Sequence, residues 1–190
     1  MKGKRPVKKF ILGTLAGAII AQVWGVFSWM VLPWHNLDFR QFANESAVAD
    51  VIRAEAKESG LYTLPNMDPS THSDEAAMKA WNDRAQRGPF AFISLKAEGI
   101  EPGMGKAMGL GFVLNATMAA ILFWMLTQTS IQSFLGQAFF LGVAGFVGAM
   151  YPHLSNWNWW HFPASYCIVG VVDLFVTWFL AGLAMAKIYR

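Results

Sequence analysis

The sequence contains little cysteine and little charge, and each shortage excludes a class of protein. Cys167 is the single cysteine among 190 residues, so neither an internal disulfide framework nor a cluster of thiolate metal ligands can form within one chain. Only 14% of the residues are charged, against about 25% in ordinary soluble domains, and 55% are hydrophobic. This composition excludes a disordered chain and a small secreted disulfide scaffold, and it favours an integral membrane protein.

Four apolar stretches reach the length of roughly 20 residues that a membrane-spanning helix needs. They cover residues 10–32, 107–126, 131–150 and 164–186. Backbone groups inside hydrocarbon must bond to one another within such a segment, so the stretches are predicted to be helices. We therefore predict an all-α membrane protein with four transmembrane helices.

The distribution of charge predicts how the chain is oriented. Five Lys or Arg residues precede the first apolar stretch and two follow the last one. Positively charged flanks stay inside the cell, so residues 1–9 and 187–190 are expected in the cytoplasm. The segment 33–106 and a Trp/His-rich loop over residues 151–163 are expected outside it. The formal net charge of +3 follows from this distribution. We expect contact with the lipid bilayer and none with nucleic acid.

The long outer segment has the signals of a small α-rich extracytoplasmic subdomain between the first two spans. Helices are predicted over residues 45–58, capped by Asn44, and over residues 74–87, capped by Ser73. Residues 90–95 are apolar and β-prone, which fits either a short strand or a segment packed on the membrane surface. Because so small a domain is marginally stable alone, we expect it to rest on the helix ends or on a partner.

Three short motifs lie at and beyond the end of the first span: Leu32-Pro33-Trp34-His35, Ser59-Gly60-Leu61-Tyr62-Thr63-Leu64-Pro65 and Gly88-Pro89-Phe90-Ala91. With them the chain resembles a group of small uncharacterised bacterial membrane proteins, and the resemblance covers most of its length. It implies one helix, an outer segment and three further helices in a bacterial inner membrane. It implies no activity.

Each predicted span carries a polar residue close to the middle of the membrane. With a rise of 1.5 Å per residue, Gln22, Asn115 and Asp173 lie within about 3 Å of the midplane, and Gln137 lies about 4.5 Å to the cytoplasmic side. The spans contain no basic residue that could pair with Asp173. Three interpretations stay open for this layer: a clamp that fixes helix register, a proton or ion site, and a contact with a partner.

Small residues recur along two spans at the spacing of a helix-packing seam. Such seams let two helix backbones approach closely, either within one chain or between membrane subunits. The seam residues are Gly13, Gly17, Ala21 and Gly25 on the first span, and Ala138, Gly142, Gly145 and Ala149 on the third.

Three histidines are expected near the outer end of the spans, namely His35, His153 and His161. Imidazole ligands with nearby methionines suit copper, and two imidazoles could hold a haem, so a metal site is one hypothesis for this face. The tryptophans of residues 157–160 are more simply explained as part of an interfacial aromatic belt. No cofactor is favoured.

The motifs of common enzyme classes do not occur in the sequence. It lacks a phosphate-binding loop after a strand, Gly-x-Ser-x-Gly, His-Glu-x-x-His and Cys-x-x-Cys-His. The favoured function is therefore a non-catalytic membrane component, either an accessory or assembly subunit of a larger complex or a homo-oligomer. The alternatives are proton- or ion-coupled transport centred on Asp173 and a haem or copper site at the outer face.

Overall fold

The computed structural model describes residues 4–190, with side chains from Val7 onward. The predicted cytoplasmic segment 1–9 thus lies partly outside the described residues. The chain divides into two compact units. A helical unit contains the residues up to Phe39 together with Gly103–Arg190, and a second unit contains Arg40–Pro102.

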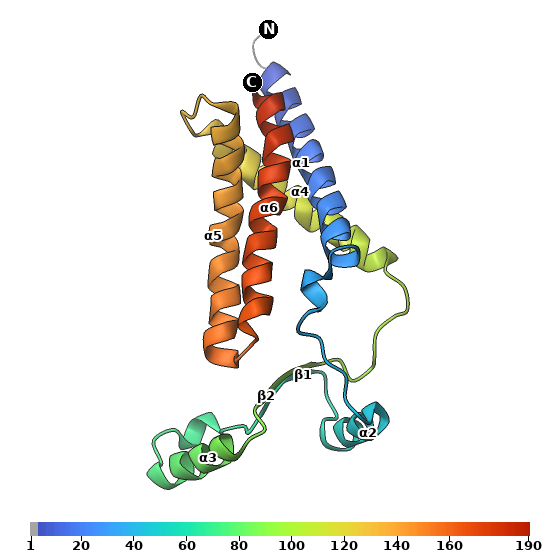
Figure 1. Ribbon diagram of the computed structural model, residues 1–190, viewed down its shortest axis with the longest axis vertical. Coiled ribbons are helices and arrows are strands. Elements are labelled where there is room, and N and C mark those ends of the chain that lie inside the picture. The colour runs from blue at the N-terminus through green and yellow to red at the C-terminus, as the bar shows by residue number, and fades with distance from the viewer. Residues whose placement is uncertain (1–3) are drawn as a thin grey trace. The chain divides into compact units, whose positions relative to one another are not determined.

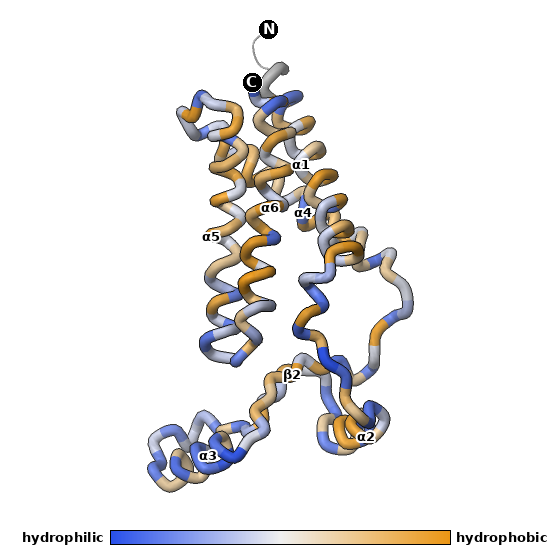
Figure 2. Tube along the Cα trace, in the orientation of Figure 1, coloured by the Kyte–Doolittle hydropathy of each residue, from blue (hydrophilic) through white to orange (hydrophobic). Residues whose placement is uncertain are grey.

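The helical unit is built on four long apolar helices, each long and apolar enough to cross a membrane. Figure 1 shows their course, and Figure 2 shows hydrophobic residues along all four. The prediction of four membrane-spanning helices is confirmed at this level. Their bounds are α1 Lys4–Met30, α4 Gly105–Thr127, α5 Phe134–Trp160 and α6 Ala164–Tyr189.

Helix α5 is longer than the sequence predicted. The segment 151–163, predicted to be a loop, is helical through Trp160, and His161 ends the helix in the left-handed conformation at φ 55°. Pro152 lies inside this helix and removes one hydrogen bond, the one to the carbonyl of Gly148. Continuing the helix pairs the backbone groups that a loop would leave to find other partners, and this outweighs the loss at one proline.

Helix α6 packs along both α1 and α5, and α1 also packs along α4. Helix α4 contacts α5 and α6 through only a few residues. The core of this unit is formed by buried apolar side chains of all four helices, among them Ala18, Phe123, Leu126, Leu141, Trp178 and Met185.

The small-residue seam of α1 packs inside the chain along most of its length. A Cβ atom added at Gly13 would collide with the ring of Phe123, and one added at Gly17 would lie 2.8 Å from Met185 Sδ. Ala21 is buried, whereas no atom lies within 4 Å of a Cβ at Gly25.

The seam of α5 faces α6. Ala138 and Ala149 are buried, and a Cβ at Gly142 would lie 3.0 Å from the Phe179 Cβ. A Cβ at Gly145 would collide with Trp178 and lie 2.7 Å from the Leu174 carbonyl oxygen. Close backbone approach within one chain thus uses these small residues.

A short 3₁₀ helix, η1, extends the helical unit beyond α1. It covers Pro33–Asn36, with Pro33 at its first position, where the missing N–H costs no hydrogen bond. The predicted outer segment began at residue 33, but residues 33–39 fold with the helices. The reason is local, because Trp34 and His35 hydrogen-bond to Ser28 on α1.

The second unit contains two helices, a 3₁₀ turn and two strands. The strands pair in antiparallel register, with Gly60 opposite Leu95 and Leu64 opposite Ala91. The all-α class is therefore wrong for this unit in its two strands, whereas the alternative of a short strand within residues 90–95 is confirmed by β2. The elements are α2 Glu45–Glu55, β1 Gly60–Leu64, η2 Pro69–Thr71, α3 Glu75–Arg87 and β2 Ala91–Leu95.

Side-chain caps begin both helices of this unit. The Asn44 side chain accepts from the Ala47 N–H, as predicted, and α2 then ends at Glu55, three residues earlier than expected. The cap of α3 is Asp74 rather than Ser73, because its carboxylate accepts from the N–H groups of both Ala76 and Ala77. A carboxylate at a helix N-terminus also interacts favourably with the helix dipole.

Ser59 joins the ends of the two strands. Its hydroxyl donates to Glu98 Oε2 at 2.7 Å and accepts from the Ala97 N–H at 2.9 Å. The hydrogen bond from Ser59 holds the pKa of Glu98 below its ordinary value, because it stabilises the ionised carboxylate.

We expect Ser59→Ala to raise the pKa of Glu98 toward the ordinary value, as measured by an NMR pH titration of the glutamate side chain. A lowered folded-state pKa stabilises the fold above the unfolded pKa, and this contribution disappears as the pH falls through the folded pKa. Thr63→Ala, which removes a half-buried hydroxyl of the same unit that does not contact Glu98, should leave the pKa of Glu98 unchanged. An unchanged value in Ser59→Ala would contradict the assignment.

Candidate functional site

A buried carboxylate on α6 is the centre of the polar cluster in the helical unit. Asp173 is 7% exposed. Its Oδ1 atom accepts two hydrogen bonds from α1, one from the Trp24 indole N–H at 2.7 Å and one from the Ser28 hydroxyl at 2.9 Å. These two donors satisfy an acceptor oxygen that would be costly to bury without hydrogen-bond partners.

His35 closes the cluster from η1. Its Nε2 atom lies 3.0 Å from Ser28 Oγ and 3.4 Å from Asp173 Oδ2. Since the single hydroxyl hydrogen of Ser28 is donated to Asp173, the contact with His35 requires the imidazole hydrogen to be on Nε2. Trp34 also donates to Ser28 Oγ, at 3.0 Å. The serine oxygen thus joins α1, η1 and α6.

This arrangement does not have the geometry of a nucleophilic triad. In a triad the imidazole uses one nitrogen for the serine and the other for the carboxylate. Here one atom, Nε2 of His35, faces both Ser28 and Asp173. Ser28 is also completely buried, so a substrate could not reach its hydroxyl.

A pocket of about 210 Å³ opens beside the cluster. The ring of Trp29 stacks on His35 with centroids 3.9 Å apart. The ring of His153 lies against Gly170, where a Cβ atom would collide with it, and its buried Nδ1 atom has no hydrogen-bond partner. The lining residues are Trp29, His35, His153, Tyr166, Gly170, Asp173 and Leu174.

The four predicted mid-membrane polar residues do not form one network. Asn115 donates through Nδ2 to Gln22 Oε1 at 2.9 Å, so these two residues join α4 to α1. Gln137 donates instead to the Ile131 carbonyl at 2.7 Å, just before its own helix. Asp173 takes its hydrogen bonds from Trp24 and Ser28.

The three candidate metal-binding histidines are not brought together. His35 and His153 line the same pocket, whereas His161 ends α5 and does not line it. Within residues 4–190, no group of three or more His, Cys, Asp or Glu side chains is placed to hold a metal ion. The geometry therefore does not support a metal site that uses all three histidines.

Sequence reasoning missed three members of the cluster, Trp24, Ser28 and Trp34. Trp24 and Ser28 are four residues apart, so they share one face of α1. Two side chains with polar tips, four residues apart on one face of a mostly apolar span, are a signal that could have identified them as partners for Asp173.

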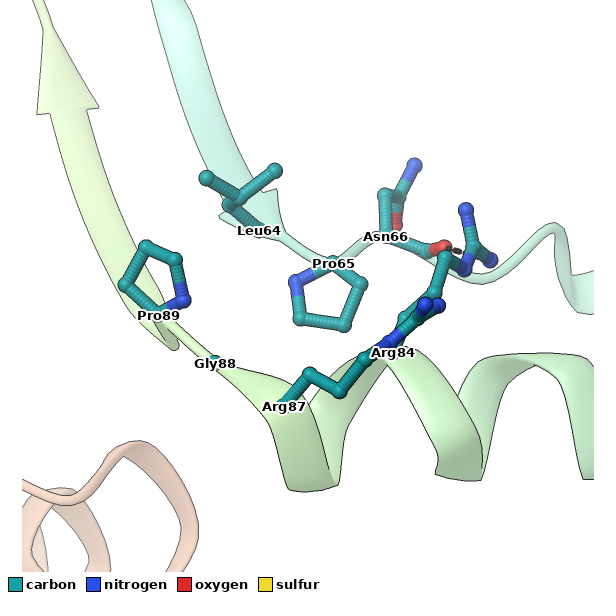
Figure 3. Close-up of a pocket in the computed structure, with 7 residues that line it drawn as sticks. All are labelled: Leu64, Pro65, Asn66, Arg84, Arg87, Gly88 and Pro89. Atoms are coloured by element: carbon teal, nitrogen blue, oxygen red, sulfur yellow. Dashed lines mark hydrogen bonds between the residues drawn. The ribbon is translucent and has the colours of Figure 1, made fainter.

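A second hollow, of about 350 Å³, lies within residues 40–102 (Figure 3). Pro65 follows β1 and Pro89 lies two residues before β2. Arg84 and Arg87 reach the rim of the hollow from the last turns of α3. The Arg84 guanidinium donates to the Asn66 carbonyl at 3.4 Å, and Arg87 Nε donates to the Asp83 carbonyl at 3.1 Å. These contacts tie the arginines to their own unit and point to no ligand.

The four long apolar helices make the chain compatible with a multi-pass membrane protein. No family model, curated protein or solved structure matches it.

Proposed function

We propose that the protein is a non-catalytic component of the bacterial inner (cytoplasmic) membrane, with both termini in the cytoplasm. It serves as an accessory or assembly subunit of a larger membrane complex, or as a homo-oligomer. Residues 40–102 form its extracytoplasmic docking subdomain. The single observation that carries the proposal is how little of this unit is buried.

Pro65 is the one buried residue among residues 40–102. Large apolar side chains of the unit are instead open, with Leu61 70% and Ile100 83% exposed. Phe42, Val51 and Leu64 are also more than half exposed. Exposed apolar surface in a unit without a core is typical of an interaction site.

The low stability expected of residues 40–102 on their own also supports a docking role. An isolated two-stranded sheet is marginally stable at best, and both helices of this unit lack buried residues. A partner that binds the folded form and covers its apolar side chains would supply the missing stabilisation by mass action.

The small-residue seams of α1 and α5 do not support the proposal of a docking surface. Gly17 and Gly145 face side chains of the same chain, so larger residues there would disturb the fold before any assembly. The docking surface must therefore be tested in the second unit.

We expect Leu61→Asp to abolish the association of the full-length protein with its partner while leaving the helical unit folded. The side chain is exposed, so the change costs the isolated chain little but places a charge in the interface. The measurement is the amount of partner, or of a differently tagged second copy, that co-purifies from native membranes in mild detergent.

Asn82→Asp is the matched control, since it adds the same charge at an exposed polar position on α3. It should retain the association. Equal recovery of the same partner with Leu61→Asp and with the unchanged protein would contradict docking through this surface.

A further inference from the structure

The pocket beside Asp173 lies in a part of the chain with no fixed positive charge from Lys or Arg. Residues 10–39 and 107–186 contain neither residue, and their acidic residues are Asp38 and Asp173. A buried carboxylate without a cation is costly, so it is balanced by an imidazolium, by a proton or by a cation from outside.

One oxygen of this carboxylate retains capacity to accept a hydrogen bond. Oδ1 of Asp173 takes two short hydrogen bonds, whereas the contact of Oδ2 with His35 is 3.4 Å, beyond the usual 2.7–3.2 Å of an N–H···O bond. The Asp173 side chain is still 10% exposed, and it lines the pocket. A further donor entering the pocket could therefore reach this carboxylate.

The rest of the wall is aromatic and apolar. Trp29, Tyr166 and the two imidazoles of His35 and His153 present rings, and Leu174 adds an aliphatic side chain. Aromatic faces attract a cation through their quadrupoles, most strongly where water is excluded. The volume of about 210 Å³ is below the roughly 300–1,000 Å³ of pockets for drug-sized ligands, which limits the occupant to a small molecule.

We propose that this pocket binds a small organic cation with a primary ammonium group. The ammonium N–H donors pair with the Asp173 carboxylate, and the charged end of the ligand lies against the ring of Trp29, which lines the same pocket. An ammonium ion needs few oxygen acceptors. Calcium and magnesium need about six oxygen ligands, which a pocket of one carboxylate, one hydroxyl and four rings does not supply.

This inference does not rest on the docking function proposed above, because its residues all belong to the helical unit. It also concerns binding alone and does not require that the cation crosses the membrane. Failure of either proposal would therefore leave the other standing.

The test is isothermal titration calorimetry of the purified full-length protein in mild detergent, with ethylammonium chloride as the probe. We expect saturable binding that sodium and potassium chloride do not reproduce. Asp173→Asn, which keeps the shape but removes the charge, should weaken binding at least about tenfold. Trp29→Leu should weaken it roughly threefold through loss of the cation–π contact.

Asp38→Asn is the matched control, because it removes a carboxylate of the same unit that does not line this pocket. The affinity of this variant for ethylammonium should equal that of the unchanged protein. Absence of saturable ethylammonium binding to the folded protein, or equal affinity for sodium, would overturn the proposal. Unchanged affinity of Asp173→Asn for ethylammonium would also overturn the proposal. If Asp173→Asn does not fold, unchanged affinity of Trp29→Leu for ethylammonium would overturn it instead.

Discussion

Replacing Gly145 with leucine separates α5 from α6 and lowers the stability of the helical unit. A Cβ at this position would collide with Trp178 and lie 2.7 Å from the Leu174 carbonyl oxygen. A backbone atom cannot rotate away as a side chain can, so the helices must move apart. Overpacking of this kind costs about 1–3 kcal/mol, which a thermal unfolding curve in detergent would measure.

Gly148→Leu is the matched control on the same helix. No atom lies within 4 Å of a Cβ there, so the space is open and leucine is the better helix former. This variant should unfold at the same temperature as the unchanged protein or at a higher one. Equal unfolding temperatures for Gly145→Leu and the unchanged protein would show that α5 does not approach α6 through this glycine.

The second large effect is expected for Asp173→Ala. The change leaves the indole N–H of Trp24, the hydroxyl of Ser28 and the Nε2–H of His35 without the carboxylate that they face. A buried donor left without its acceptor costs about 1–3 kcal/mol, so losing the acceptor of two short hydrogen bonds lowers stability by several kcal/mol. Equilibrium unfolding in detergent with increasing denaturant is the measurement.

A double-mutant cycle distinguishes this network from a general effect of the substitution. Ser28→Ala should cost less stability in the Asp173→Ala background than in the unchanged protein, because the two residues share a hydrogen bond. Asp38→Ala, at a partly exposed carboxylate, should cost no more than about 1 kcal/mol. Additive losses for Ser28 and Asp173 would contradict the assigned network.

Length and hydropathy were sufficient to predict the long helices, because a spanning helix satisfies its own backbone and needs no distant partner. The cap of α2 was predictable for a similar reason, since Asn44 bonds to a backbone group three residues away. Pairing of β1 with β2 was not predictable. It joins segments about thirty residues apart, and neither strand alone carries a strong alternating pattern.

In the candidate site too, local features were predictable from the sequence, whereas contacts between distant segments were not. The sequence gives the depth of Asp173 in its span, but it does not give the rotation of α6 about its own axis, which decides whether Asn115 or Ser28 is the neighbour. His35 was predicted at the end of the first span, yet only the turn of η1 after Pro33 brings its ring back to Ser28. Side-chain partners across helices depend on packing of the whole unit.

Native mass spectrometry of the unchanged full-length protein, extracted in mild detergent from its own membrane, tests the docking function most directly. We predict a defined assembly whose mass exceeds the 21.1 kDa of one chain by that of another protein, or is a multiple of 21.1 kDa. A bare monomer of 21.1 kDa under conditions that preserve other membrane complexes would contradict the proposed role.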